Sequence, residues 1–304
     1  MEQLKHIMII FDEAHEQQTA LLRGIELSRR CGANLHIVSV LYSTLNFIHG
    51  DILVETEEVL RQRLIERRNV EIDTILTTVN TDDINITRDI LWTPVAHEEV
   101  AQLCREYKVD LVIKTASKHS RLEGFIHTPQ DWLLLRECPC SVLIVTTETW
   151  PQGSKVLAAV DTTSADAEHR VLNKRILEQA AMMGEILQDP VHVATACAPL
   201  PVLIDMDYTV IDPNVYVDNV RANAEKHGQA IVADSAVAND NFHVVIGQPE
   251  FAINELAEKL DSRMIVLGTV SRSGLNGYLI GNTAEQMLYN MTCDILAVKP
   301  QPSN

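Results

Sequence analysis

The second half of the chain carries acidic and glycine residues directly after strand-like segments. Asp161 closes the apolar segment 155–160, Gly247 follows 242–246, and Gly268 follows 263–267. If these segments pair as parallel strands, their carboxyl ends share one edge of a sheet, which is where open α/β sheets bind ligands. At that edge, Asp161 is able to accept hydrogen bonds from a ribose or from an adenine amino group.

The loop 268–283 has the composition of a phosphate-binding turn. Its four glycines can adopt backbone conformations forbidden to other residues and allow a ligand to approach closely. We expect Asn282 to cap the helix that follows, and the N–H groups of Gly281, Asn282 and Thr283 to hold a phosphate. The simpler alternative is that the glycines serve only a tight turn and that Asp161 caps a helix start.

The elements that must position these residues occur twice along the chain. The strand 7–11 with Asp12 matches the strand that ends in Asp161, and further strand and helix-start segments recur about 150 residues apart. Each half alternates strands with helices, which predicts two doubly wound α/β domains with parallel sheets and right-handed crossovers. The predicted domains are 1–149 and 154–304, joined by a short linker rich in turn-forming residues.

The predicted strands are 7–11, 35–40, 84–91, 110–114, 141–146, 155–160, 190–196, 242–246, 263–267 and 294–299. The predicted helices are 17–31, a charged helix ending at 68, 95–107, 129–136, 168–184, 213–230, 249–260 and 283–290. In helix 168–184, apolar residues recur at helical spacing and are expected to face a sheet.

The overall charge and hydropathy limit the classes of function. The chain has 304 residues, a net charge of −17 and 46% hydrophobic residues. An acidic surface repels a phosphate backbone, so general nucleic-acid binding is not expected. No apolar run is long enough to span a membrane, and the N-terminus does not resemble a signal peptide. The expected location is therefore the cytoplasm, with no membrane partner.

The six cysteines are Cys31, Cys104, Cys138, Cys140, Cys197 and Cys293. Most lie in apolar periodic segments, as expected of small buried side chains in a reducing compartment. Cys138-Pro139-Cys140 is the only close pair, and no second pair completes a zinc set. We therefore predict no metal site, with a metal or redox role of this pair as the alternative.

Other segments are candidates for other ligands. The apolar inserts 42–54 and 198–217 either cover a domain or the interface between the halves, or wall a pocket for an apolar molecule. The basic stretch 61–68 is either a solvated helix face or a docking patch for a partner. A basic cluster in the first half either balances nearby acids in a solvated loop or binds an anion. That cluster is Lys114, Lys118, His119, Arg121 and His127, whose two histidines lack a third zinc ligand at fixed spacing.

Several segments resemble the tandem universal stress proteins, most of all the E-type members of gamma-proteobacteria. The resemblance covers both halves and is carried by 131–139, 150–151, 266–270, 281–286 and 298–300. It implies, in each half, a five-stranded parallel sheet of the Rossmann-like, adenine-nucleotide hydrolase-like type with helices on both faces. It also implies that the halves pair through their last strands as an internal pseudo-dimer. Many members bind ATP without being efficient enzymes, so ATP is the implied cofactor.

The ATP motif of this family is Gly, two residues, Gly, nine residues, Gly, then Ser or Thr. In the second half it starts at Gly268, meets Ser271 in place of the second glycine, and matches Gly281. Asn282 stands where Ser or Thr is expected, with Thr283 next. The resemblance thus implies a nearly complete ATP site in the second half.

The first half departs much further from the motif, although Asp12 matches Asp161. The three glycine positions fall on Lys114, Ser117 and His127. A phosphate cradle built from backbone is therefore not expected there.

The residues favour a binding protein over an enzyme. The motifs of P-loop NTPases, of nucleophile elbows and of dinucleotide-binding domains are absent from the sequence. We predict a stress-response protein that binds ATP in its second half and acts by ligand-dependent regulation or protein interaction. One alternative is an interaction module whose inserts bind a lipid-like molecule or a protein, and another is a slow ATP hydrolase. The sequence leaves open whether the internal pair also forms a homodimer.

Overall fold

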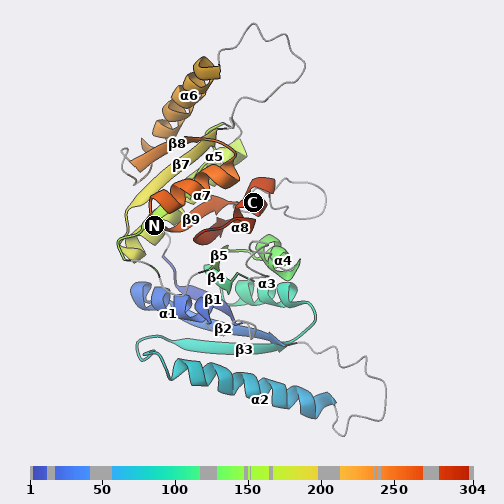
Figure 1. Ribbon diagram of the computed structural model, residues 1–304. Helices are drawn as coiled ribbons and strands as arrows, with labels where there is room; N and C mark the ends of the chain where they lie inside the picture. Colours follow the sequence, from blue (N-terminus) through green and yellow to red (C-terminus); the bar gives the residue numbers. More distant parts are fainter. Residues whose placement is uncertain are drawn as a thin grey trace.

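One continuous sheet runs through both halves of the chain in the computed structural model (Figure 1). Within the described residues it has ten strands in the order β3-β2-β1-β4-β5-β10-β9-β6-β7-β8. Strands are parallel within each half, whereas β5 and β10 pair antiparallel at the centre, with Ile144 opposite Ile295. The predicted α/β class with five parallel strands in each half is confirmed, and so is the pairing of the halves through their last strands.

The elements of the first half are β1 (His6–Phe11), α1 (Thr19–Cys31), β2 (Asn34–Leu41), α2 (Glu57–Leu76), β3 (Ile86–Trp92), α3 (Ala96–Glu106), β4 (Leu111–Thr115), α4 (Pro129–Glu137) and β5 (Ser141–Val145). Those of the second half are β6 (Lys155–Ala159), α5 (Ala167–Leu187), β7 (Val191–Cys197), α6 (Pro213–Ala233), β8 (Phe242–Ile246), α7 (Pro249–Lys259), β9 (Ser262–Gly268), α8 (Asn282–Tyr289) and β10 (Asp294–Val298). The structure describes residues 3–11, 18–41, 57–116, 129–146, 150, 152–163, 167–197, 213–233, 235, 237, 241–269 and 281–300.

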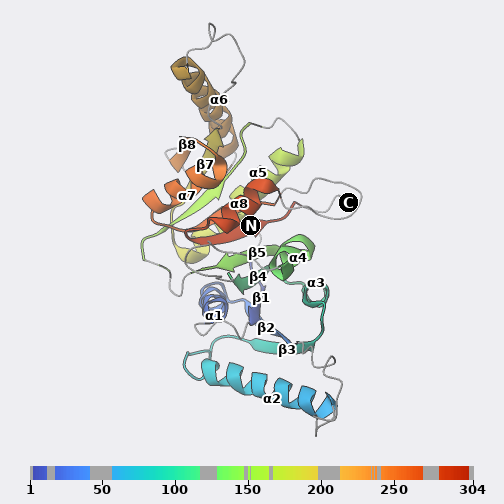
Figure 2. The ribbon, with the colours of Figure 1, turned by 45° about the vertical axis from the view of Figure 1, so that its right-hand side comes forward.

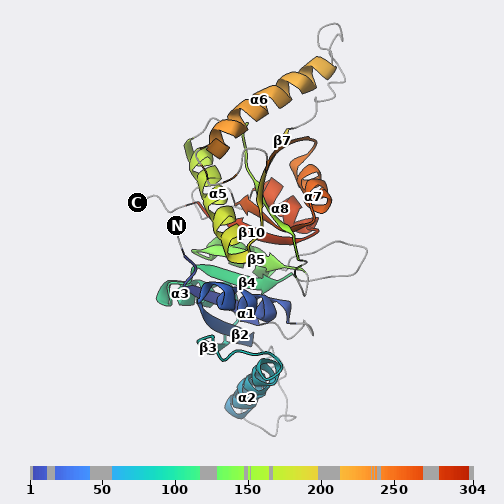
Figure 3. The same cartoon turned by 90° about the vertical axis from the view of Figure 1, so that its left-hand side faces the viewer.

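Helices cover both faces of the sheet, because successive side chains of a strand point to opposite faces. In β1, Ile7 and Ile9 join a core with α1 and α5, whereas Met8 and Ile10 join a second core with α3, α4, α7 and α8. Figure 3 shows α5 and α7 on opposite sides of the strands of the second half. Burial on both faces explains why β5 is apolar along most of its length.

Helix α5 forms as its sequence predicts. Leu172, Ile176, Ala180 and Met183 are all buried on the side that faces the sheet. The helix runs three residues beyond the predicted end, to Leu187. Its apolar spacing therefore identified the correct face, although not the exact boundary.

Helix α2 corrects the interpretation of the basic stretch 61–68. The helix does not end at 68 but continues to Leu76, and it lies beside β3 at the opposite end of the molecule from α6 (Figures 1 and 2). Arg61, Arg63 and Arg67 are exposed, as predicted for a solvated face. Arg68 is buried instead and donates a hydrogen bond to the Ser39 hydroxyl at 2.7 Å. No helix of the described residues combines the length and hydropathy needed to cross a membrane.

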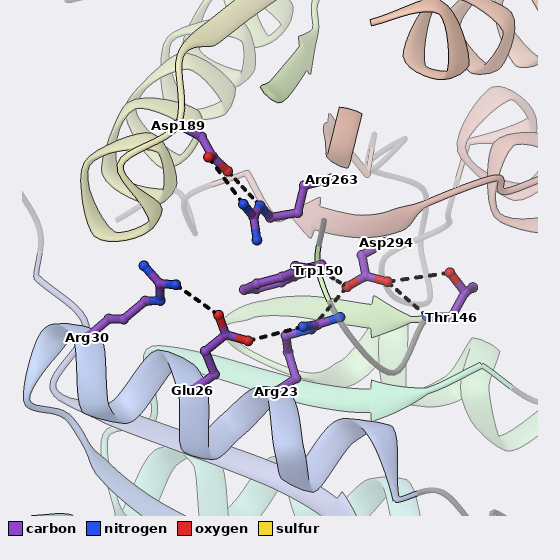
Figure 4. Close-up of polar contacts among 8 residues, drawn as sticks. All are labelled: Arg23, Glu26, Arg30, Thr146, Trp150, Asp189, Arg263 and Asp294. Carbon is purple, nitrogen blue, oxygen red and sulfur yellow. Dashed lines mark hydrogen bonds and ion pairs between the residues drawn. The ribbon is translucent and has the colours of Figure 1, made fainter. Parts of the chain in front are cut away.

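A buried carboxylate joins the two halves (Figure 4). Asp294, the first residue of β10, is 0% exposed. It accepts a hydrogen bond from the Trp150 indole N–H at 2.7 Å and another from the Thr146 backbone N–H at 2.9 Å. The Arg23 Nε lies 3.3 Å from the same carboxylate. A residue of the second half is thereby tied to α1, to the end of β5 and to the linker.

Trp150 lies between two arginines in this network (Figure 4). The guanidinium of Arg23 is 3.6 Å from the indole centroid and that of Arg263 is 5.1 Å from it, which adds cation–π attraction. Asp189 binds Arg263 through two hydrogen bonds of 2.5 and 3.2 Å. Burial lowers the pKa of the Arg23 guanidinium, and the charge of Asp294 acts in the opposite direction. Trp150, at the start of the linker, is thus held between paired charges from both halves.

Candidate functional site

The topology places a ligand-binding edge between β6 and β9. From β6 the chain adds β7 and β8 on one side, and then crosses to add β9 and β10 on the other. Such a reversal of strand order opens a crevice beyond the carboxyl ends of the two central strands. Asp161 follows β6 and Gly268 ends β9, so the structure brings these two predicted residues to neighbouring strand ends.

Asp161 is held in place by its own turn and by α5. Asn173 accepts the Asp161 N–H at 3.1 Å and donates its side-chain amide to the Asp161 carbonyl at 2.6 Å. The carboxylate accepts the N–H and the hydroxyl of Thr163 at 2.8 and 2.6 Å through one oxygen. Because a carboxylate has about four lone-pair sites, Asp161 retains capacity for a ligand hydroxyl or amine. Asn173 was missed by the sequence analysis, since an asparagine within a helix gives no signal of its own.

The neighbouring strand end contributes a buried thiol to this edge. Cys197 ends β7, next to β6, and its pKa is raised by burial and then by the negative charge of Asp161. A thiol that stays protonated is a poor nucleophile. The Cys197 thiol is therefore poorly suited to act as a nucleophile at this edge.

Packing against α5 is one reason for a glycine at position 268. A Cβ atom at this position would lie 2.5 Å from Cδ2 and 2.7 Å from Cγ of Leu172 on α5. A side chain at this position requires the Leu172 side chain or α5 to shift. The absence of a side chain at Gly268 therefore lets α5 approach β9, whether or not a ligand also uses the space.

The start of α8 carries the backbone N–H groups that the sequence predicts to hold a phosphate. The predicted cap was wrong: Gly281 is the N-cap residue, and Asn282 is the first residue of the helix. Asn282 and Thr283 are exposed, and the Gly281 carbonyl accepts the Glu285 N–H at 3.0 Å to close the first turn. The first N–H groups of a helix have no acceptor inside it, and they lie at the positive end of the helix dipole. Glu285 adds a negative charge in the same turn, which weakens the attraction for an anion.

Gly247 lies at the same edge but away from the switch point. It follows β8, which is separated from β6 by β7, or about 10 Å at the usual strand spacing. Its φ of +154° favours glycine, and its N–H donates to the Cys197 carbonyl at 2.9 Å. The turn into α7 accounts for this glycine. Ser271, Asp12 and the inserts 42–54 and 198–212 lie outside the described residues.

The first half carries a side chain where the second half has Gly268. The sheet register pairs Val145 with Thr115 and Val298 with Gly268, and these pairs close the strands. Thr115 is therefore the counterpart of Gly268. Its side chain is buried, and its hydroxyl accepts the Ala20 N–H at 3.1 Å at the start of α1. The space at the switch point of the first half is thus occupied by protein.

The same register corrects the predicted alignment of the first half. Lys114 was placed opposite Gly268 and in a solvated loop, but it lies one residue earlier, inside β4, and is buried. Pro129 takes the place of Asn282, since each is the first residue of its helix. Because proline has no N–H, α4 begins with one donor fewer than α8. The rest of the basic cluster, Lys118, His119, Arg121 and His127, lies outside the described residues.

Comparison with known proteins points to a single family. The model of the universal stress protein family matches the chain twice, over residues 3–146 and 154–299. Universal stress protein E of Escherichia coli strain K12 is 32% identical over 307 residues, which cover 99% of this chain and 95% of that protein. Universal stress protein E of Salmonella typhi is 31% identical over 301 residues, which cover 99% of this chain and 96% of that protein.

Solved structures align along nearly the whole chain as well. A Pseudomonas aeruginosa PAO1 protein described as functionally unknown has a TM-score of 0.71 and 25% identity, and the alignment covers 98% of this chain and 93% of that one. A universal stress protein from Archaeoglobus fulgidus DSM 4304 has a TM-score of 0.68 over 98% of this chain and all of that one. At 14% identity the second likeness shows the fold alone.

Proposed function

Because the chain belongs to the universal stress protein family, we propose that it is a stress-response protein that binds ATP at the carboxyl edge of its second half. The C-terminal domain, residues 154–304, would hold the nucleotide, and the N-terminal domain, residues 1–149, would be its partner in the internal pair. Asp161 would accept a hydroxyl of the ribose or the adenine amino group. The N–H groups at the start of α8 would hold phosphate oxygens.

The difference between the two halves is the observation that carries this proposal. At equivalent positions the second half has Gly268 and Asn282, whereas the first half has Thr115, which is buried, and Pro129. Asn282 keeps a backbone N–H at the start of its helix, whereas Pro129 has none to donate, and Thr115 places a buried side chain where Gly268 has none. The same fold thus provides its own comparison between an edge suited to phosphate and one that is not.

Binding at this edge is suited to regulation. The insert that begins at 198 leaves the sheet at the carboxyl end of β7, the strand beside β6. A nucleotide at Asp161 would therefore lie next to the start of this insert. We expect occupancy to change the surface that the insert offers to a protein or apolar partner. In that way the ATP concentration would control the binding of a partner to this protein without any chemical step.

The proposal is tested by making the second half resemble the first. Asn282→Pro removes one N–H group from α8, and proline is accepted at the first helical position, as Pro129 shows in α4. A charge-assisted hydrogen bond contributes about 1.5–3 kcal/mol, so ATP affinity should fall about 10- to 150-fold. Asn282→Ala keeps the N–H group and serves as the matched control.

The measurement is the thermal shift with ATP, followed by calorimetric titration. ATP at about 100 times its Kd should stabilise the unaltered protein by about 2.7 kcal/mol. The shift should persist in Asn282→Ala and shrink in Asn282→Pro. Equal shifts in both variants would remove the start of α8 from the site, and no shift in the unaltered protein would contradict nucleotide binding altogether. Steady phosphate release that is lost in Asp161→Ala would instead identify a slow hydrolase.

A further inference from the structure

Three cysteine sulfurs meet on one face of the first half, outside the nucleotide edge. Cys104 lies on α3, Cys138 directly follows α4, and Cys140 directly precedes β5. The Sγ atoms of Cys104 and Cys138 are 3.8 Å apart, those of Cys138 and Cys140 are 3.4 Å apart, and all three lie within 4.8 Å of one another. Cys104 and Cys138 are buried, whereas Cys140 is half-buried.

A fourth sulfur lies beside this cluster. The thioether of Met8, on β1, is 3.9 Å from the Cys104 Sγ, and Met8 is fully buried. Among the described residues, no histidine, aspartate, glutamate or further cysteine joins the three thiols. The side chains available at this point of the fold are therefore sulfur donors, which are soft ligands.

The second half shows that the fold does not require a thiol at two of these three positions. The ninth residue of α3 is Cys104, and the ninth residue of α7 is Ala257. The two positions ahead of β5 that carry Cys138 and Cys140 correspond to Met291 and Cys293 ahead of β10. All three counterparts in the second half are buried. Packing thus accepts alanine in place of Cys104 and methionine in place of Cys138, so it does not account for the convergence of three thiols in the first half.

The sulfur spacing matches a shared metal ion. Thiolates bound to one tetrahedral ion at about 2.3 Å lie about 3.8 Å apart, close to the observed separations. A disulfide would need only two of the sulfurs, at about 2.05 Å. We propose that Cys104, Cys138 and Cys140 bind one thiophilic metal ion, Cu⁺ or Zn²⁺, through three thiolates, with Met8 able to complete a sulfur-only set around Cu⁺.

A cation from the other half balances the charge of this site. Lys299, which follows β10, is buried and close enough to Cys138 and Cys140 to interact with them electrostatically. Its ammonium group also donates to the Arg136 carbonyl at the end of α4 at 2.8 Å. Three thiolates and a divalent ion carry a net charge of −1, which one lysine neutralises. Metal binding would therefore strengthen a contact between the two halves.

The test uses the full chain, reduced and free of metal, titrated with Cu⁺ and separately with Zn²⁺ against a chromophoric competitor. At least one of the two ions should bind with a stoichiometry of one per chain. Its binding should produce a thiolate-to-metal charge-transfer band in the absorption spectrum. Cys104→Ala reproduces the residue of the second half and should therefore fold, yet lose more than about 100-fold in affinity. Cys293→Ala removes a buried cysteine outside the cluster and should bind like the unaltered protein.

Two further variants distinguish Cu⁺ binding from Zn²⁺ binding and keep the proposal testable if Cys104→Ala does not fold. Cys140→Ser changes the half-buried member of the cluster and should lose affinity to a similar extent. Met8→Leu should weaken Cu⁺ binding at least about tenfold while leaving Zn²⁺ binding unchanged if Cu⁺ is the ion bound. The proposal is overturned if neither ion binds, or if a folded Cys104→Ala or Cys140→Ser protein binds with unchanged stoichiometry and affinity.

Discussion

Replacing the buried Asp294 by asparagine should strongly destabilise the protein. The side chain keeps its volume but loses its charge, and Asp294 and Arg23 are 0% and 1% exposed. Donors from Trp150 and Thr146 converge on both carboxylate oxygens. The new amide group must point its own N–H groups at one of these donors, whichever way it is turned. Breaking a buried ion pair from one side costs about 3–5 kcal/mol.

A second carboxylate reduces the expected loss of stability. Glu26 accepts a hydrogen bond from the Arg23 Nη1 at 3.3 Å and is one-third exposed. It continues to balance part of the arginine charge when Asp294 is neutral. We therefore expect the loss to fall near the lower end of the range, at about 3 kcal/mol.

Urea unfolding followed by circular dichroism measures this loss. The midpoint should fall in Asp294→Asn while the slope stays unchanged. Glu178→Gln, which removes an exposed partner of Lys174, is the matched control and should change stability by less than about 0.5 kcal/mol. The double variant with Arg23→Met should be more stable than the sum of the single losses implies, because no uncompensated charge remains. A loss below about 1 kcal/mol in Asp294→Asn, or strict additivity, would refute this account of the network.

Two further predictions concern the second half. Gly268→Ala should cost about 1–3 kcal/mol in thermal unfolding, because its Cβ would lie 2.5 Å from Leu172. The change Leu172→Ala should cost less in that variant than in the unaltered protein, and additive losses would contradict the packing argument. The rings of His192 and His243 stack with centroids 5.1 Å apart. Burial, followed by the neighbouring His243, lowers the pKa of His192, and burial lowers the pKa of His243. The unfolded chain therefore binds more protons, so the stabilisation is complete above about pH 6.5 and is lost on acidification below it. The urea midpoint should fall less between about pH 7 and about pH 5 in His243→Asn than in the unaltered protein, and an equal fall would exclude the pair as a cause.

Local patterns predicted the elements of this fold well. The twofold repeat, the alternation of strands and helices and the buried face of α5 depend on residues close in sequence, so the sequence shows them directly. The end of α2 was placed too early, at 68, because the mixed polar pattern of 69–76 gives no clear helical period, although the segment contains no glycine or proline that would end a helix. The edge that carries Asp161 and Gly268 was also predicted, since strand ends follow from the same alternation.

The tertiary structure decided which residues far apart in the chain contact one another. Gly268 packs on Leu172, and Cys104 joins Cys138 across 34 positions of sequence. Arg68, expected in solvent, reaches Ser39. Such contacts depend on strand register and on the distance between a helix and the sheet, which no local pattern specifies. The sequence by itself determined which elements form and which edge they share, whereas packing determined which side chains at that edge are free for a ligand and which belong to the core.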